Sequence, residues 1–254
     1  MNVVMIGSGK VAALLSKKIH NAGLKVLQVY SPNLQHATLL ADIINAEATN
    51  NIENIIQSAN IYIIAIADDS IEGVASKLNV SKKALVLHTS GAVNMNVLKS
   101  CSDFYGVLYP IQSISKTTDN NAVLPFAIDA NNDIAMETIK FITNALHSNV
   151  EILNDLQRLH LHIAAVFVNN FVNFLYFNAS NICKDATINF NVLQPLIEET
   201  ALRLRNNLPE VVFTGPAIRK DFSTINKHLK VLETNEQLFE LYYFLTKCIL
   251  VKES

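Results

Sequence analysis

The stretch VVMIGSGKVA, residues 3–12, decides the fold of this 254-residue chain. A short apolar run ends at Gly7, and a helical pattern begins after Gly9. Gly7 permits a tight turn, Gly9 lets the backbone approach a pyrophosphate, and Ala12 lets a helix pack closely on a strand. The N-terminus of the helix that follows offers free N–H groups to phosphate oxygens. The spacing GxGxxA therefore predicts a strand–turn–helix unit that binds a dinucleotide; the alternative is the same fold without the ligand.

Strand and helix patterns alternate over roughly the first 150 residues, which is typical of a doubly wound sheet. The β-branched run IYIIAIA at 61–67 is typical of a strand buried on both faces. We expect the other strands at residues 3–6, 25–30, 46–49, 84–88, 104–110 and 124–129. After about residue 150 the patterns become helical, at 154–184, 190–206, 221–232 and 235–251. The sequence predicts an α/β chain: a Rossmann-like, mostly parallel dinucleotide-binding domain over 1–152, then an all-helical substrate and dimerisation domain over 153–254.

Composition narrows the class of protein. Half of the residues are hydrophobic, 17% are charged and the formal net charge is −2, so the basic surplus typical of a nucleic-acid binder is missing. The three cysteines lie far apart and form no CxxC pair, which favours reduced thiols. The sequence shows no metal-ligand cluster, no signal-peptide pattern and no uninterrupted apolar run of about 18 residues. We expect a soluble, cytoplasmic protein that binds neither nucleic acid nor membrane, and a homodimer formed through the apolar helix at 235–251.

Polar residues follow several strands at one edge of the predicted sheet, where ligands bind in open α/β folds. The end of the second strand reads Tyr30-Ser31-Pro32-Asn33 and lacks the acid that usually holds the ribose of NAD, so NADP is favoured over NAD. Asn33, Asp68 or Asp69 could instead cap helices. The predicted cofactor-binding residues are Gly7, Ser8, Gly9, Lys10, Val11, Ser31, Asn33, Ala67, Asp68, Asp69, His88 and Ser90.

The helical part opens with LHIAAVFVNNFVN, residues 161–173, an apolar helix interrupted by polar side chains. At 3.6 residues per turn, a sector of about 60° holds His162, Val166, Asn169 and Asn173, and Asn170 lies at its edge. This stripe predicts a face turned toward a ligand cleft or an interhelical polar network.

Several motifs together resemble one known family: GxGxxA at 7–12, ADD at 67–69, HTSG at 88–91, YPIQS at 109–113, LHIAAVFVNNFVN and TGPAIRKD at 214–221. In that family a Rossmann-like domain precedes a helical domain of uncharacterised function. More distantly, the chain is similar to pyrroline-5-carboxylate reductase and the 3-hydroxyacid dehydrogenases. The resemblance covers essentially the whole chain and implies an NAD(P) domain and a helical domain that often dimerises.

The resemblance also exposes a difference. The hydroxyacid dehydrogenases carry a catalytic lysine three and four residues before a pair of polar residues. Asn169 and Asn170 match that pair, but Val166 stands in place of the lysine and has no proton to donate. The hypothesis is that His162 takes over as acid or base and that Asn170 orients the substrate. The alternative is a structural histidine bonded to a neighbouring helix.

The leading function is an NADP-dependent oxidoreductase that acts on a small carbonyl or imine. The predicted substrate-binding residues are Thr89, Gln112, Asn169, Asn173 and Arg219. Arg219 could clamp a carboxylate or pair with Asp221 in a rigid loop, and His160, beside Arg158, is expected near the surface. The alternatives are a non-catalytic NAD(P)-binding sensor or assembly protein and, third, a hydrolase built from His88, Ser90 and Asp68, for which no GxSxG elbow is present.

Overall fold

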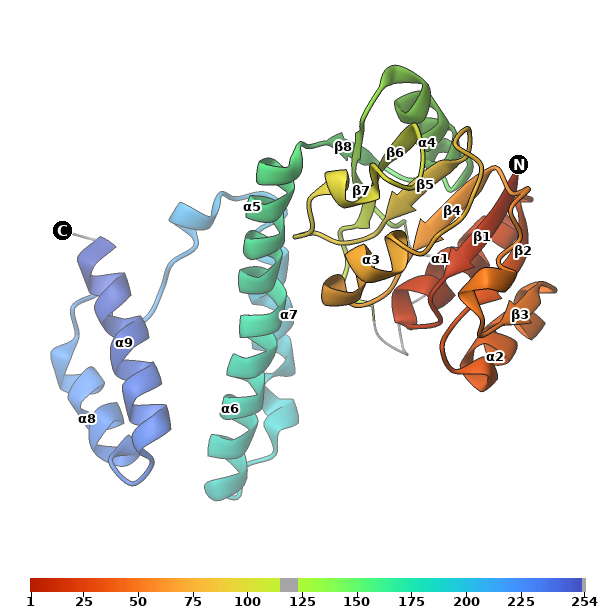
Figure 1. Ribbon diagram of the computed structural model, residues 1–254. Coiled ribbons are helices and arrows are strands. Elements are labelled where there is room, and N and C mark those ends of the chain that lie inside the picture. The colour runs from red at the N-terminus through yellow and green to blue at the C-terminus, as the bar shows by residue number, and fades with distance from the viewer. Residues whose placement is uncertain (115–122, 253–254) are drawn as a thin grey trace. The chain divides into compact units, whose positions relative to one another are not determined.

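A computed structural model describes residues 1–114 and 123–252 of the chain. The chain forms two compact units, Met1–Asn170 and Phe171–Ser254. The first contains the sheet and the second is helical, which confirms the predicted class of an α/β part followed by a helical part (Figure 1). The functional boundary expected after residue 152 stays a prediction.

The first unit is built on one eight-stranded sheet in the order β3-β2-β1-β4-β5-β6-β7-β8. Its strands are β1 (Asn2–Ile6), β2 (Lys25–Tyr30), β3 (Glu47–Thr49), β4 (Ile61–Ile64), β5 (Leu85–His88), β6 (Phe104–Pro110), β7 (Phe126–Ala130) and β8 (Val150–Ile152). All neighbouring pairs are parallel except β6 and β7, so the sheet is mostly parallel, as predicted. β4 is shorter than the predicted strand at 61–67 because the chain turns at its end into α3.

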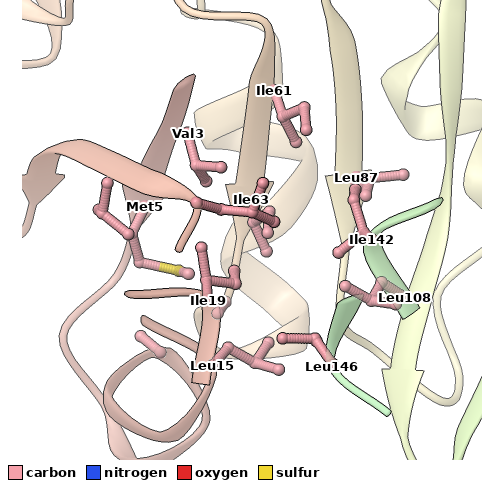
Figure 2. Close-up of a cluster of buried hydrophobic side chains, with 14 of the residues drawn as sticks. Val3, Met5, Leu15, Ile19, Ile61, Ile63, Leu87, Leu108, Ile142 and Leu146 are labelled. Carbon is pink, nitrogen blue, oxygen red and sulfur yellow. The ribbon is translucent and has the colours of Figure 1, made fainter. Parts of the chain in front are cut away.

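The helices of the first unit are α1 (Lys10–Asn21), α2 (Leu34–Ile44), α3 (Asp68–Ala75), α4 (Asp133–Ala145) and α5 (Asp155–Ala165). Alternate residues of each strand face opposite sides of the sheet, so two apolar clusters form. One cluster, shown in part in Figure 2, includes Val3, Met5, Leu15, Ile19, Ile63 and Ile142. The other includes Val4, Ile6, Ile64, Ile71 and Leu98. All four residues of β4 are fully buried, which confirms the expectation of a strand covered on both faces.

The helix predicted over 154–184 is not uniform. It consists of α5, a π-helical segment over Val166–Phe171, and α6 (Val172–Asp185). The expectation of a regular 3.6-residue period through this stretch is therefore wrong. A π-turn closes hydrogen bonds from i to i+5, which widens the turn, and such turns occur often at functional sites. By length and composition alone, the run Asp155–Asp185 could cross a membrane, which is weak support for a membrane span.

The second unit continues with α6, α7 (Gln194–Arg203), α8 (Phe222–Leu232) and α9 (Glu236–Lys252). α8 and α9 agree with the predicted helices to within one residue. Asp221 caps α8, because its side chain accepts a hydrogen bond from the Thr224 N–H and another from the Thr224 hydroxyl. Among the described residues of this unit, the buried hydrophobic ones are Cys183, Ala217, Ile225 and Leu238. The helices of the second unit therefore have little apolar core of their own.

Candidate functional site

A cavity of about 510 Å³ lies at the carboxyl edge of the sheet, where β1 and β4 end, and we call it the sheet-edge cavity. The glycine motif and the end of β2 form much of its wall. The predicted cofactor-binding residues that line it are Gly7, Ser8, Gly9, Lys10, Val11, Ser31 and Asp68. Thr89 and Gln112, predicted to bind substrate, line it as well.

The two glycines of the motif have different structural roles. Gly7 has φ +126°, and a Cβ there would lie 2.2 Å from the Ala65 carbonyl oxygen, so only glycine fits. Gly9 has φ −72° and nothing within 4 Å of where its Cβ would stand, so its backbone faces open space. No side chain caps α1 at Gly9, and the first N–H groups of a helix have no intrahelical partner. This end of α1 therefore suits a pyrophosphate.

The polar groups around the end of β2 are hydroxyls and amides. The Ser8 hydroxyl donates to the Ser31 hydroxyl at 2.9 Å, which joins the glycine turn to the second strand. Asn33 caps α2 by accepting from the His36 N–H, and it is not among the described residues that line the cavity. Ser31 is thus better placed than Asn33 for a ribose or its phosphate.

The loop after β4 leads into α3 through Ala67, the N-cap residue, which makes no side-chain capping bond. Asp68 and Asp69 are the first residues of α3, so the alternative that either one caps the helix is wrong. Asp68 lines the sheet-edge cavity, whereas Ala67 and Asp69 do not appear among its described lining residues. Negatively charged side chains in the first turn interact favourably with the positive end of the helix dipole.

His88 and Ser90 support the loop after β5 from inside. His88 is fully buried, and its Nδ1 accepts from the Ser90 N–H at 3.2 Å. The buried Ser90 hydroxyl accepts from the Ala92 and Val93 N–H groups. Direct contact of His88 or Ser90 with a cofactor stays a prediction, and the burial of both side chains does not favour it. A hydrolase built from His88, Ser90 and Asp68 is disfavoured too, because the serine hydroxyl is held in a turn.

A second cavity of about 350 Å³ lies between the end of β6 and the helix that carries the asparagines, and we call it the helix cavity. It is lined by four residues singled out from the sequence, His162, Asn169, Asn170 and Gln112, and by Val166. Gln112 lines both cavities, so the two are adjacent. Tyr109 also lines the helix cavity and was not predicted as a site residue.

Both asparagines lie in the π-turn and line this cavity. Asn170 was expected at the edge of the polar stripe, but it lines the cavity together with Asn169. The Asn169 amide donates to the Asn170 side-chain oxygen at 3.3 Å. Asn173 and Arg219 belong to the second unit, so their predicted contact with substrate remains a prediction.

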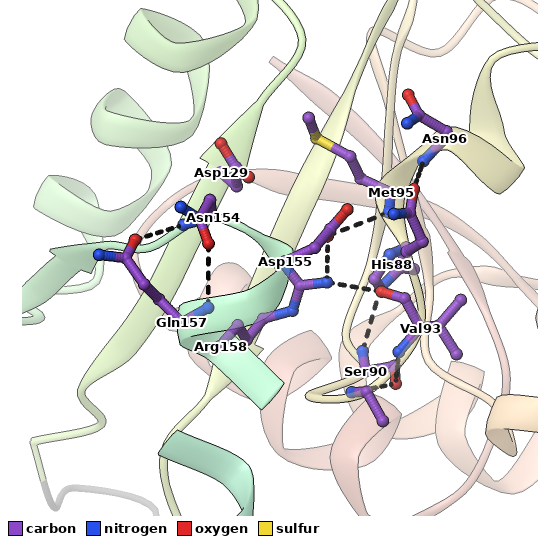
Figure 3. A network of polar contacts seen from close by, with 12 residues as sticks. His88, Ser90, Val93, Met95, Asn96, Asp129, Asn154, Asp155, Gln157 and Arg158 are labelled. Carbon is purple, nitrogen blue, oxygen red and sulfur yellow. Dashed lines mark hydrogen bonds and ion pairs between the residues drawn. The ribbon is translucent and has the colours of Figure 1, made fainter. Parts of the chain in front are cut away.

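The start of α5 is fixed by an ion pair between the buried Arg158 and the part-buried Asp155 (Figure 3). Arg158 donates to the Asp155 carboxylate and to the Val93 carbonyl, and Asp155 accepts from the Met95 N–H. His160 is exposed, as expected, whereas the side chain of its neighbour Arg158 is only 1% exposed. A capping box between Asn154 and Gln157 fixes the same turn. These bonds attach the first turn of α5 to the loop that follows β5.

Burial shifts the protonation of two groups near this ion pair. Burial first, and the Arg158 charge second, lower the pKa of His88 to about 4, while Asp155 opposes them. Burial raises the pKa of Asp129. In the described residues His88 Nε2, Arg158 Nε and Arg158 Nη1 have no protein partner. His88 is therefore neutral at physiological pH.

Within residues 1–114 and 123–252, no group of three or more His, Cys, Asp or Glu side chains could hold a metal ion.

Family comparisons agree with this geometry. Residues 2–91 match the family described as NADP oxidoreductase coenzyme F420-dependent, and residues 124–249 match the Domain of unknown function (DUF2520). A candidate NADP oxidoreductase from Bacteroides fragilis is 34% identical over 98% of this chain and 97% of its own, with a TM-score of 0.88. The chain belongs to this two-domain family. The predicted resemblance is confirmed, and NADP is confirmed as the cofactor of the domain family.

More distant structures share the fold alone. A 1-pyrroline-5-carboxylate reductase from Streptococcus pyogenes has a TM-score of 0.65 at 13% identity, covering 100% of this chain and 98% of its own. A pyrroline carboxylate reductase from Plasmodium falciparum with NADP bound has a TM-score of 0.64 at 13% identity, covering 98% of each chain. No curated protein matches the sequence.

Replacing Arg158 by Ala should lower the free energy of unfolding by about 3–5 kcal/mol, because it leaves the Asp155 carboxylate without its buried partner. The matched control is Arg203→Ala, which breaks an exposed pair with Glu199 and should cost at most about 0.5 kcal/mol. Urea denaturation of the two variants measures both values. Equal losses would show that the Arg158 pair contributes no more than a surface pair.

His88 should make the fold sensitive to acid. Below pH 6.5 the unfolded chain protonates this histidine, whereas the folded chain resists protonation down to about pH 4. The free energy of unfolding should therefore fall by about 3 kcal/mol as the pH drops through this window. His88→Asn should remove that part of the dependence, and His36→Asn, at an exposed histidine, should keep it. If denaturation curves of the His88 variant follow the wild-type dependence, another group is responsible.

Proposed function

We propose that this protein is an NADP-dependent oxidoreductase that acts on a small carbonyl or imine. One observation carries the proposal: the sheet-edge cavity and the helix cavity share Gln112. A dinucleotide held at the glycine motif can thus present its reactive end beside a substrate in the helix cavity. The oxidoreductase class follows from the family, and the substrate class is the proposed part.

The residues present fit the cofactor. The open backbone at Gly9 and the uncapped N-terminus of α1 would hold the pyrophosphate, and Ser31 would contact the ribose phosphate. When bound, NADPH supplies a hydride to the substrate carbon. The family description also names coenzyme F420, which is therefore a further candidate ligand of the helix cavity.

The helix cavity would hold the substrate between His162 and the asparagine pair. Reduction adds one hydride to the carbon and one proton to the oxygen or nitrogen; we assign to the His162 Nε2–H the hydrogen bond that stabilises this atom, and the proton comes from solvent. Asn170 would orient the same polar atom through its amide. Val166 lines this cavity and supplies no proton, so the lysine-assisted mechanism is not available here.

A sensor or assembly protein that binds NADP without turnover is the second candidate. The valine at position 166 favours it, because the cavity lacks the lysine of the hydroxyacid dehydrogenases. The two candidates share the cofactor site and differ only in turnover.

Gly9→Ala tests the cofactor site with little effect on the fold, since its methyl group would meet no protein atom but would enter the cavity. We expect NADPH affinity, measured by fluorescence titration, to fall at least about tenfold, which is about 1.4 kcal/mol. Gly73→Ala is the control, because Gly73 also has nothing within 4 Å of its Cβ position but lies in α3.

The same NADPH-bound protein is then screened for NADPH oxidation with imines, 2-keto acids, 3-keto acids and coenzyme F420. The His162→Gln variant should no longer turn over the substrate identified in this screen. Binding without turnover across the panel would favour the sensor, and unchanged binding in Gly9→Ala would contradict the proposed cofactor site.

We also propose that a second copy of the chain covers the helical unit. Its large apolar side chains remain exposed on every helix, including Phe174, Phe177, Leu196, Val231 and Phe244. Extended apolar surfaces of this kind mark protein–protein contacts. Each copy has the same exposed apolar helices, so two copies related by a twofold axis can cover each other's apolar side chains.

Phe177→Glu should therefore dissociate the dimer, because a carboxylate would enter the apolar contact. Leu39→Glu is the control, since Leu39 in α2 is exposed to the same degree, 59% against 60% for Phe177. Analytical ultracentrifugation should give twice the chain mass of 28.1 kDa for the wild type and Leu39→Glu, and the chain mass for Phe177→Glu. A monomeric wild type would contradict the proposal.

A further inference from the structure

Tyr109 and His162 form a close pair in the wall of the helix cavity. The Tyr109 hydroxyl lies 3.0 Å from His162 Nδ1, and the two rings meet edge to face with centroids 5.8 Å apart. The residues are 53 positions apart in the sequence, one at the end of β6 and the other on α5. In the described residues no protein group bonds Nε2, the other nitrogen of the His162 ring.

Gly91 leaves the space that this pair occupies. A Cβ at Gly91 would lie 2.9 Å from His162 Nδ1 and 2.9 Å from Tyr109 Cζ. Real Cβ atoms essentially never approach so closely. The HTSG loop after β5 is therefore shaped to let the tyrosine and the histidine meet. The Asp155–Arg158 pair holds α5 against this same loop, one helical turn before His162.

The hydroxyl of Tyr109 keeps its proton at neutral pH. Burial raises the pKa of this phenol, and the nearby Asp68 carboxylate raises it further. A protonated phenol needs an acceptor, and His162 Nδ1 is the partner within reach. When Nδ1 accepts, a neutral imidazole carries its proton on Nε2.

We propose that Tyr109 is a positioning residue that holds His162 as the Nε2–H tautomer, so that the histidine presents a donor to a substrate oxygen or nitrogen. The inference rests on the proposed function, in which His162 donates to substrate. The opposite tautomer would present a lone pair from Nε2 and could not donate to that atom. A hydrogen bond to one ring nitrogen sets the role of the other, which is the effect assigned to Tyr109.

The chain contains a matched control for this pair. In the second unit the Tyr242 hydroxyl lies 2.8 Å from His228 Nδ1, with ring centroids 5.6 Å apart and an interplanar angle of 83°. Tyr242→Phe removes the same hydrogen bond at a residue that lies outside both cavities among the described residues.

The experiment is ¹⁵N NMR of the histidine rings in full-length, cofactor-free protein above pH 8. In the wild type, His162 should show a protonated Nε2 and an unprotonated Nδ1. Tyr109→Phe should shift its ring signals toward a mixture of tautomers, whereas Tyr242→Phe should change His228 alone. Gly91→Ala should have the effect of Tyr109→Phe, because its methyl group separates the pair and leaves both side chains in the protein.

Turnover gives the second readout. On the substrate identified above, Tyr109→Phe should lower kcat at least about tenfold with little change in KM for NADPH, and Tyr242→Phe should leave both unchanged. A wild-type His162 with its proton on Nδ1, or ring signals unaffected by Tyr109→Phe, would overturn the inference whatever the activity. If the tautomer is as expected but His162→Gln turns over like the wild type, the assigned role of His162 fails, and with it the catalytic purpose of the pair.

Discussion

The candidate site depends on one buried charge. Arg158 is the only residue of α5 that is buried among those described, so an ion pair rather than an apolar contact secures the start of this helix. A guanidinium in the interior is costly unless it is paired, which makes its partners Asp155 and the Val93 carbonyl obligatory. Those partners fix the direction in which α5 leaves the sheet. His162 lies four residues after Arg158 on the same helical face, so the ion pair also fixes where the histidine can stand.

The same charge helps to keep His88 neutral. His88 is the last residue of β5, and a second positive charge near Arg158 would be repelled, which adds to the effect of burial on the pKa of His88. A neutral His88 can accept from the Ser90 N–H through Nδ1, and the Ser90 hydroxyl in turn holds the next two N–H groups. The HTSG motif is thus mainly a scaffold: it shapes a turn that ends at Gly91, where the tyrosine and the histidine meet.

Local patterns were enough to predict most of the fold, because each depends on neighbouring residues. The glycine motif and the β-branched run at 61–67 predicted the first strands, the turn and the cofactor class. The strand β8 and the antiparallel pairing of β7 were not predicted. Both depend on pairing between distant segments, and a three-residue strand such as β8 leaves little pattern in the sequence. The buried Arg158 and the pairing of Tyr109 with His162 depend on contacts across 65 and 53 positions, and no local signal marked them. The π-turn was missed because a periodicity argument assumes a constant turn.

The groups that line the helix cavity differ from those of a site with a catalytic lysine. With Val166 in the wall, the helix cavity has no cation from this helix, and its polar side chains are amides, a serine hydroxyl, a histidine and a phenol. A regular helix would place Asn170 at the edge of the polar stripe that holds Asn169. In the π-turn both asparagines line the cavity, where the Asn169 amide donates to the Asn170 side-chain oxygen. Such a cavity can orient a neutral carbonyl or imine through hydrogen bonds, whereas a lysine would add a charge that favours an anionic oxygen. In the proposed function, oriented dipoles would therefore do at the reacting atom of the substrate what a cation does in the hydroxyacid dehydrogenases.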